Sequence, residues 1–342
     1  MVSVTSRIAI TDTTNEQGER ARREKRALRV AVIGARGIGK HHAKWWRLEG
    51  AEVCAFAGVH PEAQEKTAQG LRELFPFEGR GYTDVGAMLE KERPDIVDVC
   101  CPPPCHYGHV RTALESGCHV LCEKPFVYDA QLESDALRDQ ARELISSAQS
   151  RGLRLSVCTQ YAAGAAMFAR IWKDLRRGEI ITHYHGHLES PARNRAPDPR
   201  RVWVDLSPHS LSVLLSLAPD AEIVPASLRT TFQGYEALAE FDVRTSSGSE
   251  MHAIIVTRNA LQPPLNVRHF KYNGYPFVVE GQNDADGVYC ARIETPNGNY
   301  LEPDMMHAVI RDFLKGSPTG DVNVCSKNLD FMLRIMDAAK SE

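Results

Sequence analysis

Residues 28–42, LRVAVIGARGIGKHH, decide the fold of this chain. Residues 28–33 form a short apolar, β-branched run that stops at Gly34, a pattern typical of a buried parallel strand. A glycine turn follows and leads into a helix that we expect to end near Gly50. Glycines between a strand and a helix let the backbone approach a diphosphate, which the helix N-terminus then stabilises. The stretch therefore predicts the start of a dinucleotide-binding domain.

The spacing of these glycines departs from the common pattern G-x-G-x-x-G. Gly34 and Gly39 match it, but its middle position is Arg36. Counted as G-x-x-G-x-G, the turn gives the middle role to Gly37. We predict cofactor contacts from Gly34, Arg36, Gly37, Ile38 and Gly39. The alternative is a turn that serves only the close packing of a helix on a strand.

The end of the second predicted strand bears on the choice of cofactor. An acidic residue at this position accepts hydrogen bonds from the adenosine ribose of NAD and repels the ribose phosphate of NADP. Residues 57–60 are AGVH and contain no acid. The guanidinium of Arg36 offers a partner for a phosphate, unless it points into solvent. The sequence therefore predicts NAD(P) as the cofactor and favours NADP.

The two halves of the chain have different patterns of strands and helices. Apolar runs at residues 52–57, 96–101, 119–122 and 153–159 alternate with helical segments, which predicts an α/β Rossmann domain with a doubly wound parallel sheet. In the second half, strands follow one another at 228–233, 237–245, 252–257, 277–280 and 287–295, with helices at 165–176, 305–314 and 328–339. This pattern predicts an α+β C-terminal domain with a large, mostly antiparallel open sheet. The expected boundaries are a flexible arm at 1–27, a Rossmann domain at 28–158 and a second domain at 159–342.

The composition is that of a globular protein, and its net charge does not suggest a whole-protein affinity for polyanions, although it leaves a local basic patch open. The chain has 342 residues, of which 43% are hydrophobic and 25% charged, and its net charge is −3. We therefore expect no nucleic-acid partner and no membrane partner. The nine cysteines are too sparse for a secreted disulfide scaffold, and residues 1–26 contain no apolar core of signal-peptide length. These features predict reduced thiols and a cytoplasmic location.

Three stretches of the first half together resemble one family. They are LRVAVIGARGIGKHH (28–42), DIVDVCCPPPCH (95–106) and ALESGCHVLCEKPF (113–126). This combination is similar to the glucose–fructose oxidoreductase/inositol dehydrogenase (Gfo/Idh/MocA) family, with Glu123-Lys124-Pro125 as its most specific mark. In the second half, RVWVDLSPHSLSVLL (201–215) resembles the family segment in which an aspartate and a histidine lie four residues apart, here Asp205 and His209.

The resemblance implies an NAD(P)-dependent oxidoreductase that acts on a CH–OH group of a sugar, cyclitol or sugar derivative. It implies that His209 is the general acid/base, that Lys124 bridges the cofactor and the reacting oxygen, and that Asp205 holds the substrate or tunes His209. It also places Cys101, Pro102, His106 and Glu123 beside the cofactor. Two departures from the family pattern are Arg36 in the cofactor turn and residues 199–204, PRRVWV, in place of a glycine-rich stretch.

Two other functions fit the same fold. One is glycoside cleavage or epimerisation assisted by transient oxidation, with a tightly bound cofactor and no net change in the nicotinamide. The other is a dinucleotide-sensing regulator that has lost turnover, although the retention of Lys124, Asp205 and His209 argues against it. In each case we expect a small-molecule partner and a homodimer or homotetramer, because an open sheet leaves an apolar face that commonly pairs with a second copy.

Two clusters resemble metal ligands, but we predict no metal site. Cys100 and Cys101 are adjacent on a strand and point to opposite faces, and Cys105-His106 has no second ligand pair at zinc-site spacing. The other cluster is His183, His185 and His187, which alternate on one strand face. Three such imidazoles are able to bind zinc, but they more often line a sheet face or a cleft.

Four arginines precede Asp205, at positions 193, 195, 200 and 201. If this segment closes over the cleft, its guanidinium groups select an anionic substrate such as a uronate, a sugar phosphate or a sugar nucleotide. The alternative is a basic loop that faces solvent. The sequence leaves both interpretations open.

Overall fold

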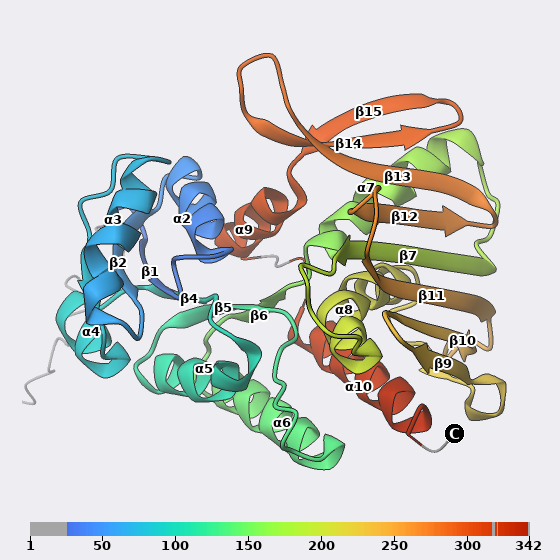
Figure 1. The fold of residues 1–342 in the computed structure, drawn as a ribbon, viewed down its shortest axis with the longest axis horizontal. Helices are drawn as coiled ribbons and strands as arrows, with labels where there is room; N and C mark the ends of the chain where they lie inside the picture. The colour runs from blue at the N-terminus through green and yellow to red at the C-terminus, as the bar shows by residue number, and fades with distance from the viewer. Residues whose placement is uncertain (1–25, 317–318, 320, 341–342) are drawn as a thin grey trace, which may run out of the picture.

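The computed structural model describes residues 26–316, 319 and 321–340 (Figure 1). The predicted arm at 1–27 therefore lies outside the described residues, apart from its last two positions. Across the described segments, we find no helix with both the length and the apolar character that a bilayer crossing requires.

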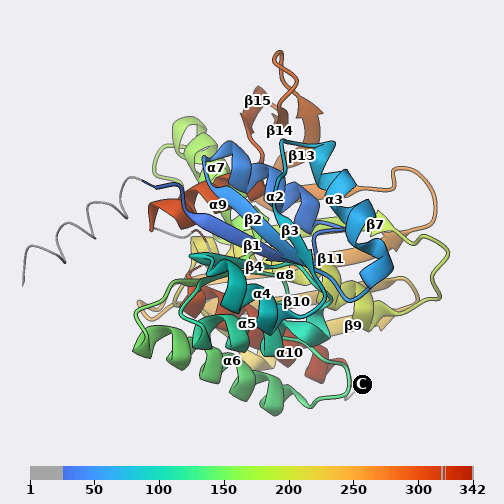
Figure 2. The ribbon, with the colours of Figure 1, turned by 90° about the vertical axis from the view of Figure 1, so that its left-hand side faces the viewer.

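Within the described part of the chain, the first half forms a six-stranded parallel sheet with the order β3-β2-β1-β4-β5-β6. The strands are β1 (Arg29–Ile33), β2 (Glu52–Ala57), β3 (Arg80–Tyr82), β4 (Ile96–Val99), β5 (His119–Glu123) and β6 (Leu155–Cys158). The central strands are apolar and buried on both faces because helices cover both sides. Figure 2 shows α2 and α3 on one side of this sheet and α4, α5 and α6 on the other.

The helices of this half begin and end at local signals in the sequence. They are α2 (Gly39–Leu48), η1 (Pro61–Ala63), α3 (Gln64–Arg72), α4 (Val85–Glu92), η2 (Pro103–Cys105), α5 (His106–Glu115) and α6 (Ser134–Ser150). The side chain of Asp84 caps α4 by accepting a hydrogen bond from the backbone N–H of Ala87 at 2.6 Å. Gly117, with a φ of +79°, follows the end of α5.

The second half is built on a nine-stranded sheet of the described residues, with the order β15-β14-β13-β12-β7-β11-β10-β8 and with β9 paired to β10. All its pairs are antiparallel except β7 with β11. The strands are β7 (His183–Pro191), β8 (Glu222–Ile223), β9 (Arg229–Gln233), β10 (Glu236–Arg244), β11 (Glu250–Ala260), β12 (Val267–Tyr272), β13 (Tyr275–Asn283), β14 (Tyr289–Thr295) and β15 (Gly298–Pro303).

Helices cover one face of this sheet and connect it to the first half (Figure 1). They are α7 (Gln160–Leu175), α8 (Pro199–Leu217), η3 (Pro225–Ser227), α9 (Met305–Lys315) and α10 (Val322–Ala338). α8 packs on β7, β10 and β11, while α10 contacts α8 and also α6 and β6 of the first sheet. α9 lies against α2 and α7. These contacts set the position of α8 relative to the strand ends of the first sheet.

Both predicted sheet types are confirmed, but several element boundaries were wrong. The sequence did not predict β12 or β15, because polar and charged residues break their apolar alternation. The last helix begins at Val322 rather than at residue 328, since Asp321 caps it by accepting from the backbone N–H of Asn323 at 2.9 Å. The predicted domain boundary at residue 159 falls between β6 and α7, and we keep it as a proposal.

Candidate active site

The candidate site lies where the strand order of the first sheet reverses. β1 and β4 are neighbours, and the chain continues from them toward opposite edges of the sheet, so that their carboxyl ends border a crevice. The glycine turn at 34–39 follows β1, residues 101–106 follow β4, and Glu123-Lys124 lies at the end of β5. Because the strands are parallel, the structure places these three segments along the same edge of the sheet.

Two glycines of the turn are required by close packing, and a third borders open space. A Cβ on Gly34, whose φ is +92°, would lie 2.7 Å from the carbonyl oxygen of Cys100. A Cβ on Gly39 would lie 2.5 Å from the carbonyl oxygen of Gly34. A Cβ on Gly37 would meet no described atom within 4 Å. Gly34 and Gly39 therefore build the turn, and Gly37 leaves the space beside it free.

The N-terminus of α2 suits a diphosphate. Among the described residues, no side chain caps this end of the helix, and no acidic residue lies in its first turn. Its backbone N–H groups and the positive end of its dipole therefore attract an anion. Arg36 and Ile38 are exposed beside the turn. A dinucleotide diphosphate thus fits the residues that are present.

His106 supports the loop between β4 and α5 rather than facing open space. It is fully buried, with Nδ1 2.9 Å from the carbonyl oxygen of Pro125 and Nε2 2.8 Å from that of Cys101. It therefore links the loop after β4 to the turn after β5. Cys101 is half-buried and Pro102 is exposed, so both are able to contact a bound molecule.

Lys124 joins the first sheet to the second half of the chain. Its Nζ donates to Oδ1 of Asp205 at 2.6 Å and to the backbone carbonyl of Asp205 at 2.7 Å. Burial by itself raises the pKa of Asp205, but the charge and the hydrogen bond of Lys124 outweigh burial and lower it. Asp205 is therefore a carboxylate at neutral pH. Its side chain is 48% exposed, and contact with solvent also favours the ionised form.

α8 is held in place by contacts along its whole length. Asp198 caps it by accepting from the backbone N–H of Arg201 at 2.9 Å, and Pro199 occupies the first turn. Gly186 of β7 allows α8 to approach closely, since a Cβ there would lie 1.8 Å from Oγ of Ser210. Nε1 of Trp203 donates to the carbonyl of Met332 in α10 at 3.1 Å. These contacts direct the side of α8 that carries Asp205 toward Lys124.

His209 lies one turn beyond Asp205 and is a buried base. It is 7% exposed, and its ring packs edge-on against Tyr161 at a centroid distance of 5.2 Å. Burial above all, and then the charges of Lys124 and Arg268, hold the pKa of His209 well below 6.5. Its Nδ1 has no hydrogen-bond partner among the residues that the structure describes. A neutral imidazole in this setting is suited to accept a proton.

Arg268 and Tyr161 also belong to the site, and the sequence did not predict them. Arg268 lies on β12 and donates to the backbone carbonyls of Val267 and Glu189. Its charge contributes to the lowered pKa of both Asp205 and His209. In β12, Arg268 lies on the same face as Phe270 and Tyr272, which are buried, but the polar residues of this strand hid that pattern in the sequence.

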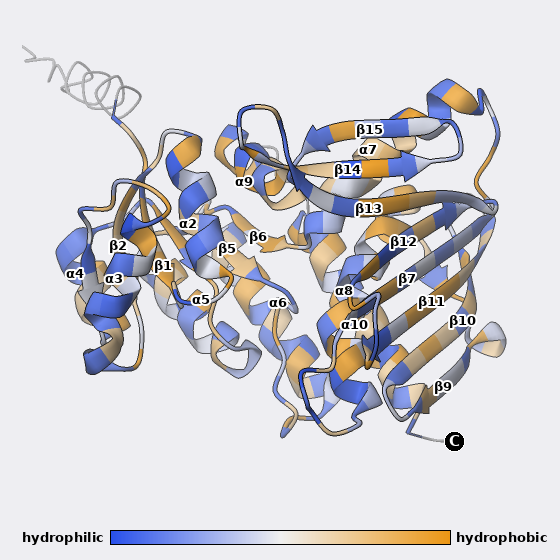
Figure 3. Cartoon of the chain, turned by 45° about the horizontal axis from the view of Figure 1, so that its top comes forward, coloured by the Kyte–Doolittle hydropathy of each residue, from blue (hydrophilic) through white to orange (hydrophobic). Residues whose placement is uncertain are grey.

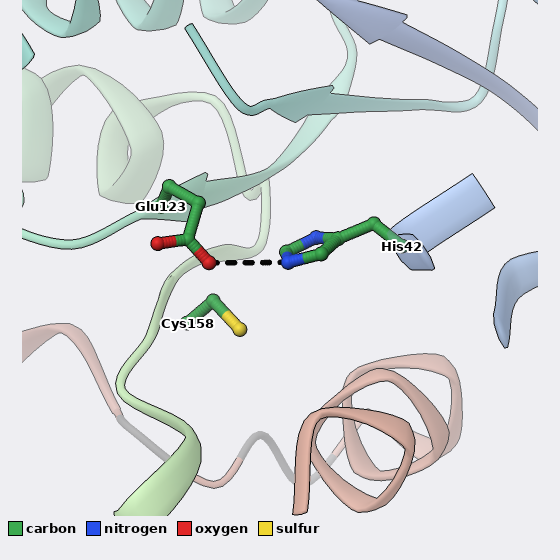
Figure 4. Close-up of side chains that lie close together, drawn as sticks. All are labelled: His42, Glu123 and Cys158. Atoms are coloured by element: carbon green, nitrogen blue, oxygen red, sulfur yellow. Dashed lines mark hydrogen bonds and ion pairs between the residues drawn. The ribbon is translucent and has the colours of Figure 1, made fainter. Parts of the chain in front are cut away.

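The side chain of Glu123 points inward and contacts His42 of α2 (Figure 4). Nε2 of His42 lies 3.1 Å from Oε1 of Glu123, whose side chain is 12% exposed. The other carboxylate oxygen of Glu123 accepts from the backbone N–H of Lys124 at 3.2 Å. Sequence analysis did not single out His42, although residues 42 and 46 both lie on the buried face of α2.

The four loop arginines separate into two kinds. Arg200 and Arg201 belong to the first turn of α8, and their guanidinium groups donate to the carbonyls of Met336 at 3.5 Å and Ala196 at 3.1 Å. Arg193 and Arg195 are exposed. The charge of Arg195 also contributes to the lowered pKa of Asp205, so this arginine lies near the site.

The three alternating histidines of β7 share a face, as predicted, and this face is turned away from α8. Tyr184, between them, points to α8 and donates to the carbonyl of Ser210 at 2.8 Å. His187 lies beside His185 and His269, with ring centroids 6.4 and 6.2 Å away. In the described residues, the groups with converging metal-ligand atoms all contain His42, and none includes these three histidines.

Fold and site together define a Rossmann-type sheet whose carboxyl edge suits a dinucleotide, followed by a second, mostly antiparallel sheet. Residues 28–159 match the GFO_IDH_MocA oxidoreductase family, NAD-binding Rossmann fold. This match agrees, over the first half of the chain, with the Gfo/Idh/MocA resemblance that the motifs predicted.

The chain is similar to several characterised proteins over part of their length. It is 37% identical to D-glucoside 3-dehydrogenase of Escherichia coli over 130 residues, which are 36% of this chain and 32% of that protein. It is 28% identical to D-apiose dehydrogenase of Paraburkholderia graminis over 63% of this chain and 55% of that protein. The chain thus spans between a third and about half of these two relatives.

Solved structures share the whole fold at low sequence identity. The UDP-N-acetylglucosamine 3-dehydrogenase of Acidithiobacillus ferrooxidans superimposes with a TM-score of 0.67 at 19% identity. The superposition covers 92% of this chain and 98% of that protein. The similarity extends through both sheets and shows that the second half has the same architecture.

Proposed function

We propose that this chain transfers hydride between a nicotinamide dinucleotide and a hydroxyl- or keto-bearing carbon of a sugar, cyclitol or sugar derivative. The observation that carries the proposal is the meeting of Lys124, from the end of β5, with Asp205 of α8 at 2.6 Å, one helical turn from the buried base His209. The two relatives named above are dehydrogenases of a glucoside and of apiose, which supports a sugar-like substrate.

His209 is the group that takes the hydroxyl proton in this proposal. Its lowered pKa keeps it neutral at physiological pH, so it is ready to act as a base for alcohol oxidation. In the reverse direction, the protonated ring returns the proton to the alkoxide oxygen. The bound nicotinamide would supply the hydride-accepting carbon, and His209 would handle only the proton.

Lys124 stabilises negative charge on the same oxygen. Its ammonium already lies beside the crevice and is oriented by the Asp205 carboxylate. A fixed cation near a developing alkoxide lowers the barrier electrostatically. Asp205 has a half-exposed carboxylate, which leaves it able to accept a hydrogen bond from a second substrate hydroxyl.

The test is a screen for turnover. Purified protein is mixed with NAD or NADP and a panel of glucosides, pentoses, cyclitols and nucleotide sugars, and the absorbance of reduced nicotinamide is followed. We expect cofactor reduction with at least one sugar class. Cofactor binding without turnover across the panel would favour a sensing role instead.

We also propose that NADP is preferred over NAD. In support, β2 ends at Ala57 with no acid among residues 57–60, and the guanidinium of Arg36 is exposed beside the glycine turn. Fluorescence titrations with NADPH and NADH on the same protein sample measure the two dissociation constants. Tighter binding of NADH would overturn this preference.

We further propose that the substrate bound in the second half of the site carries a negative charge. Arg195 and Arg268 both act on Asp205, which supports a cationic wall facing the crevice. The paired substitutions Arg193→Glu and Arg195→Glu should weaken the binding of anionic substrates far more than the binding of neutral ones. Equal weakening of uronates and neutral sugars would end this expectation.

We propose a homodimer or homotetramer that uses the outer face of the second sheet. This face carries half-buried apolar residues, among them Leu238, Ile254, Val256 and Val278, in register with the histidines of β7. Figure 3 shows hydrophobic and hydrophilic residues interspersed along these strands. Light scattering on the wild type and on Val256→Asp measures the oligomeric state, and a monomeric wild type would exclude the assembly.

A further inference from the structure

A buried hydrogen-bonded cluster behind the glycine turn has no part in the proton and hydride chemistry above. His42 and Asp98 are both fully buried. Nδ1 of His42 lies 2.9 Å from Oδ2 of Asp98, and Nε2 lies 3.1 Å from Oε1 of Glu123. Nε1 of Trp46 donates to the same Asp98 oxygen at 2.5 Å. The imidazole therefore bridges two carboxylates that lie on different strands.

This arrangement favours the imidazolium form of His42. Carboxylates accept hydrogen bonds, so both ring nitrogens must carry a proton to donate to them. Burial by itself lowers the pKa of His42, but the charge and the hydrogen bond of the neighbouring Asp98 carboxylate hold it well above 6.5. A charge in a fully buried position is tolerated when it is paired and hydrogen-bonded.

The same cluster brings together atoms of the kinds that ligate metals. Figure 4 shows His42, Glu123 and Cys158, whose ligand atoms lie within 4.8 Å of one another; the ligand atoms of His42, Asp98 and Cys100 are equally close. A histidine that ligates a metal needs a free imidazole nitrogen. Here both ring nitrogens of His42 face carboxylate oxygens. The geometry is that of an ion triad.

The triad connects the helix that follows the glycine turn to the lysine of the site. His42 lies in the first turns of α2, and Asp98 and Glu123 lie on β4 and β5. Glu123 uses its second oxygen to accept from the backbone N–H of Lys124 at 3.2 Å. The Glu123 carboxylate thus contacts His42 through one oxygen and accepts from the backbone N–H of Lys124 through the other.

We propose that His42 is a positioning residue: its imidazolium fixes Glu123, and Glu123 fixes the backbone from which Lys124 reaches Asp205. The inference rests on the proposed function, in which Lys124 stabilises the reacting oxygen. His42 touches neither that oxygen nor Asp205 and acts only through Glu123. A displacement of a reacting group by about 1 Å is enough to cost up to 10²-fold in rate.

The charge of His42 depends on every titratable group packed around it. These groups come from β4, β5, β6, α9 and α2 itself: Asp98, Cys100, Glu123, Cys158, Asp304 and His41. Their carboxylates stabilise the charged ring, and loss of its proton at alkaline pH would remove one of its two hydrogen bonds. The positioning effect should therefore weaken as pH rises through the pKa of His42.

The decisive variant is His42→Gln, with His41→Gln as its control. His41 is the neighbouring histidine on the same helix, but it is exposed. For His42→Gln we expect a kcat lower by roughly tenfold or more at saturating cofactor, while the dissociation constant for the dinucleotide changes little. In a Lys124→Arg background, His42→Gln should cause little further loss, because the two residues act in sequence. An unchanged kcat, or the same fold loss in both backgrounds, overturns the proposal.

Two readouts do not depend on turnover. In nitrogen-15 histidine spectra at neutral pH, we expect both ring nitrogens of His42 to be protonated; a neutral ring overturns the proposal. The rate of reductive methylation of Lys124, measured by mass spectrometry, should rise severalfold in His42→Gln and not in His41→Gln, and an unchanged rate also overturns it. If His42→Gln does not fold, Glu123→Gln removes the same ion pair, and the same two outcomes apply to its kcat and labelling rate. A wild type without turnover, but with a charged His42 and this labelling response, would reject the proposed function alone.

Discussion

The two halves of the site are encoded in the chain in different ways. The proposed cofactor half comprises three short segments, 34–39, 101–106 and 123–124, each at the carboxyl end of a parallel strand. The proposed substrate half comprises single residues that are far apart in the sequence, namely Tyr161 on α7, Asp205 and His209 on α8, and Arg268 on β12. Parallel strands bring their carboxyl ends together whatever the rest of the fold does. The second group meets only because two helices and a sheet pack in one particular way.

The architecture of the first half of the site depends on few local features, whereas the detailed geometry of the second half depends on how several elements pack together. A diphosphate needs little more than a glycine turn and a helix N-terminus. The position and the pKa of His209 depend on burial and on Lys124 and Arg268 from two other elements. Variants on the two sides should therefore fail in different ways.

The largest effects are expected where the two halves meet. Lys124→Ala and His209→Ala should each lower kcat by roughly 10²–10⁴-fold, because one removes the cation beside the oxygen and the other removes the base. Dinucleotide binding should remain measurable in both variants. Steady-state kinetics and fluorescence titration make the measurement, with the outer-face Lys271→Ala as control. Turnover like that of the wild type in either variant would contradict the roles proposed for these residues.

The glycine turn gives the sharpest separation between folding and binding. Gly34→Ala should destabilise the protein by about 2 kcal/mol or more, because it adds a positive-φ penalty and a contact with the carbonyl of Cys100. Gly37→Ala meets no described atom of the protein, so its unfolding midpoint should match the wild type while its dinucleotide affinity falls. Thermal unfolding and cofactor titration of both variants test this contrast. Equal loss of stability in the two would show that the turn serves packing alone.

In the substrate half, Arg268 should shift the pH dependence of oxidation. Arg268 lowers the pKa of His209, so Arg268→Met should raise that pKa and leave more of the ring protonated at acid pH. The acidic limb of kcat/KM should move to higher pH, with a severalfold lower rate below neutrality. Arg195→Met is the control, since Arg195 acts on Asp205 and not on His209. An acidic limb that stays in place in Arg268→Met would count against His209 as the base.

The smallest effect is expected at Arg36, on the exposed side of the cofactor half. Arg36→Ala should weaken the binding of NADPH by about 1 kcal/mol or less, because an exposed guanidinium contributes little to each ion pair. The binding of NADH should remain nearly unchanged. The ratio of the two dissociation constants, measured at low and high salt, is the readout. Equal weakening of both cofactors would mean that Arg36 contacts the diphosphate and not a ribose phosphate.

Sequence patterns predicted the fold class and three polar residues of the site. The strand-turn-helix at 28–42 predicted the Rossmann sheet because its signals are local, namely apolar runs, glycines and capping residues. Lys124, Asp205 and His209 were found through motif resemblance, and the structure places Lys124 against Asp205. Arg268 and Tyr161 were missed because β12 has a polar, weakly alternating sequence and because no pattern links residues 161 and 268.

By itself, the sequence determined that a parallel sheet with alternating helices forms the first half, where a glycine turn follows its first strand, and that an aspartate and a histidine share one side of a helix. All of these follow from backbone periodicity and from the steric limits of single residues. Only the tertiary structure decided that Lys124 reaches Asp205, that His209 is buried with a lowered pKa, and that His42 lies between Asp98 and Glu123. Charge states depend on burial and on neighbours from distant segments, and those neighbours come together only when the whole chain has folded.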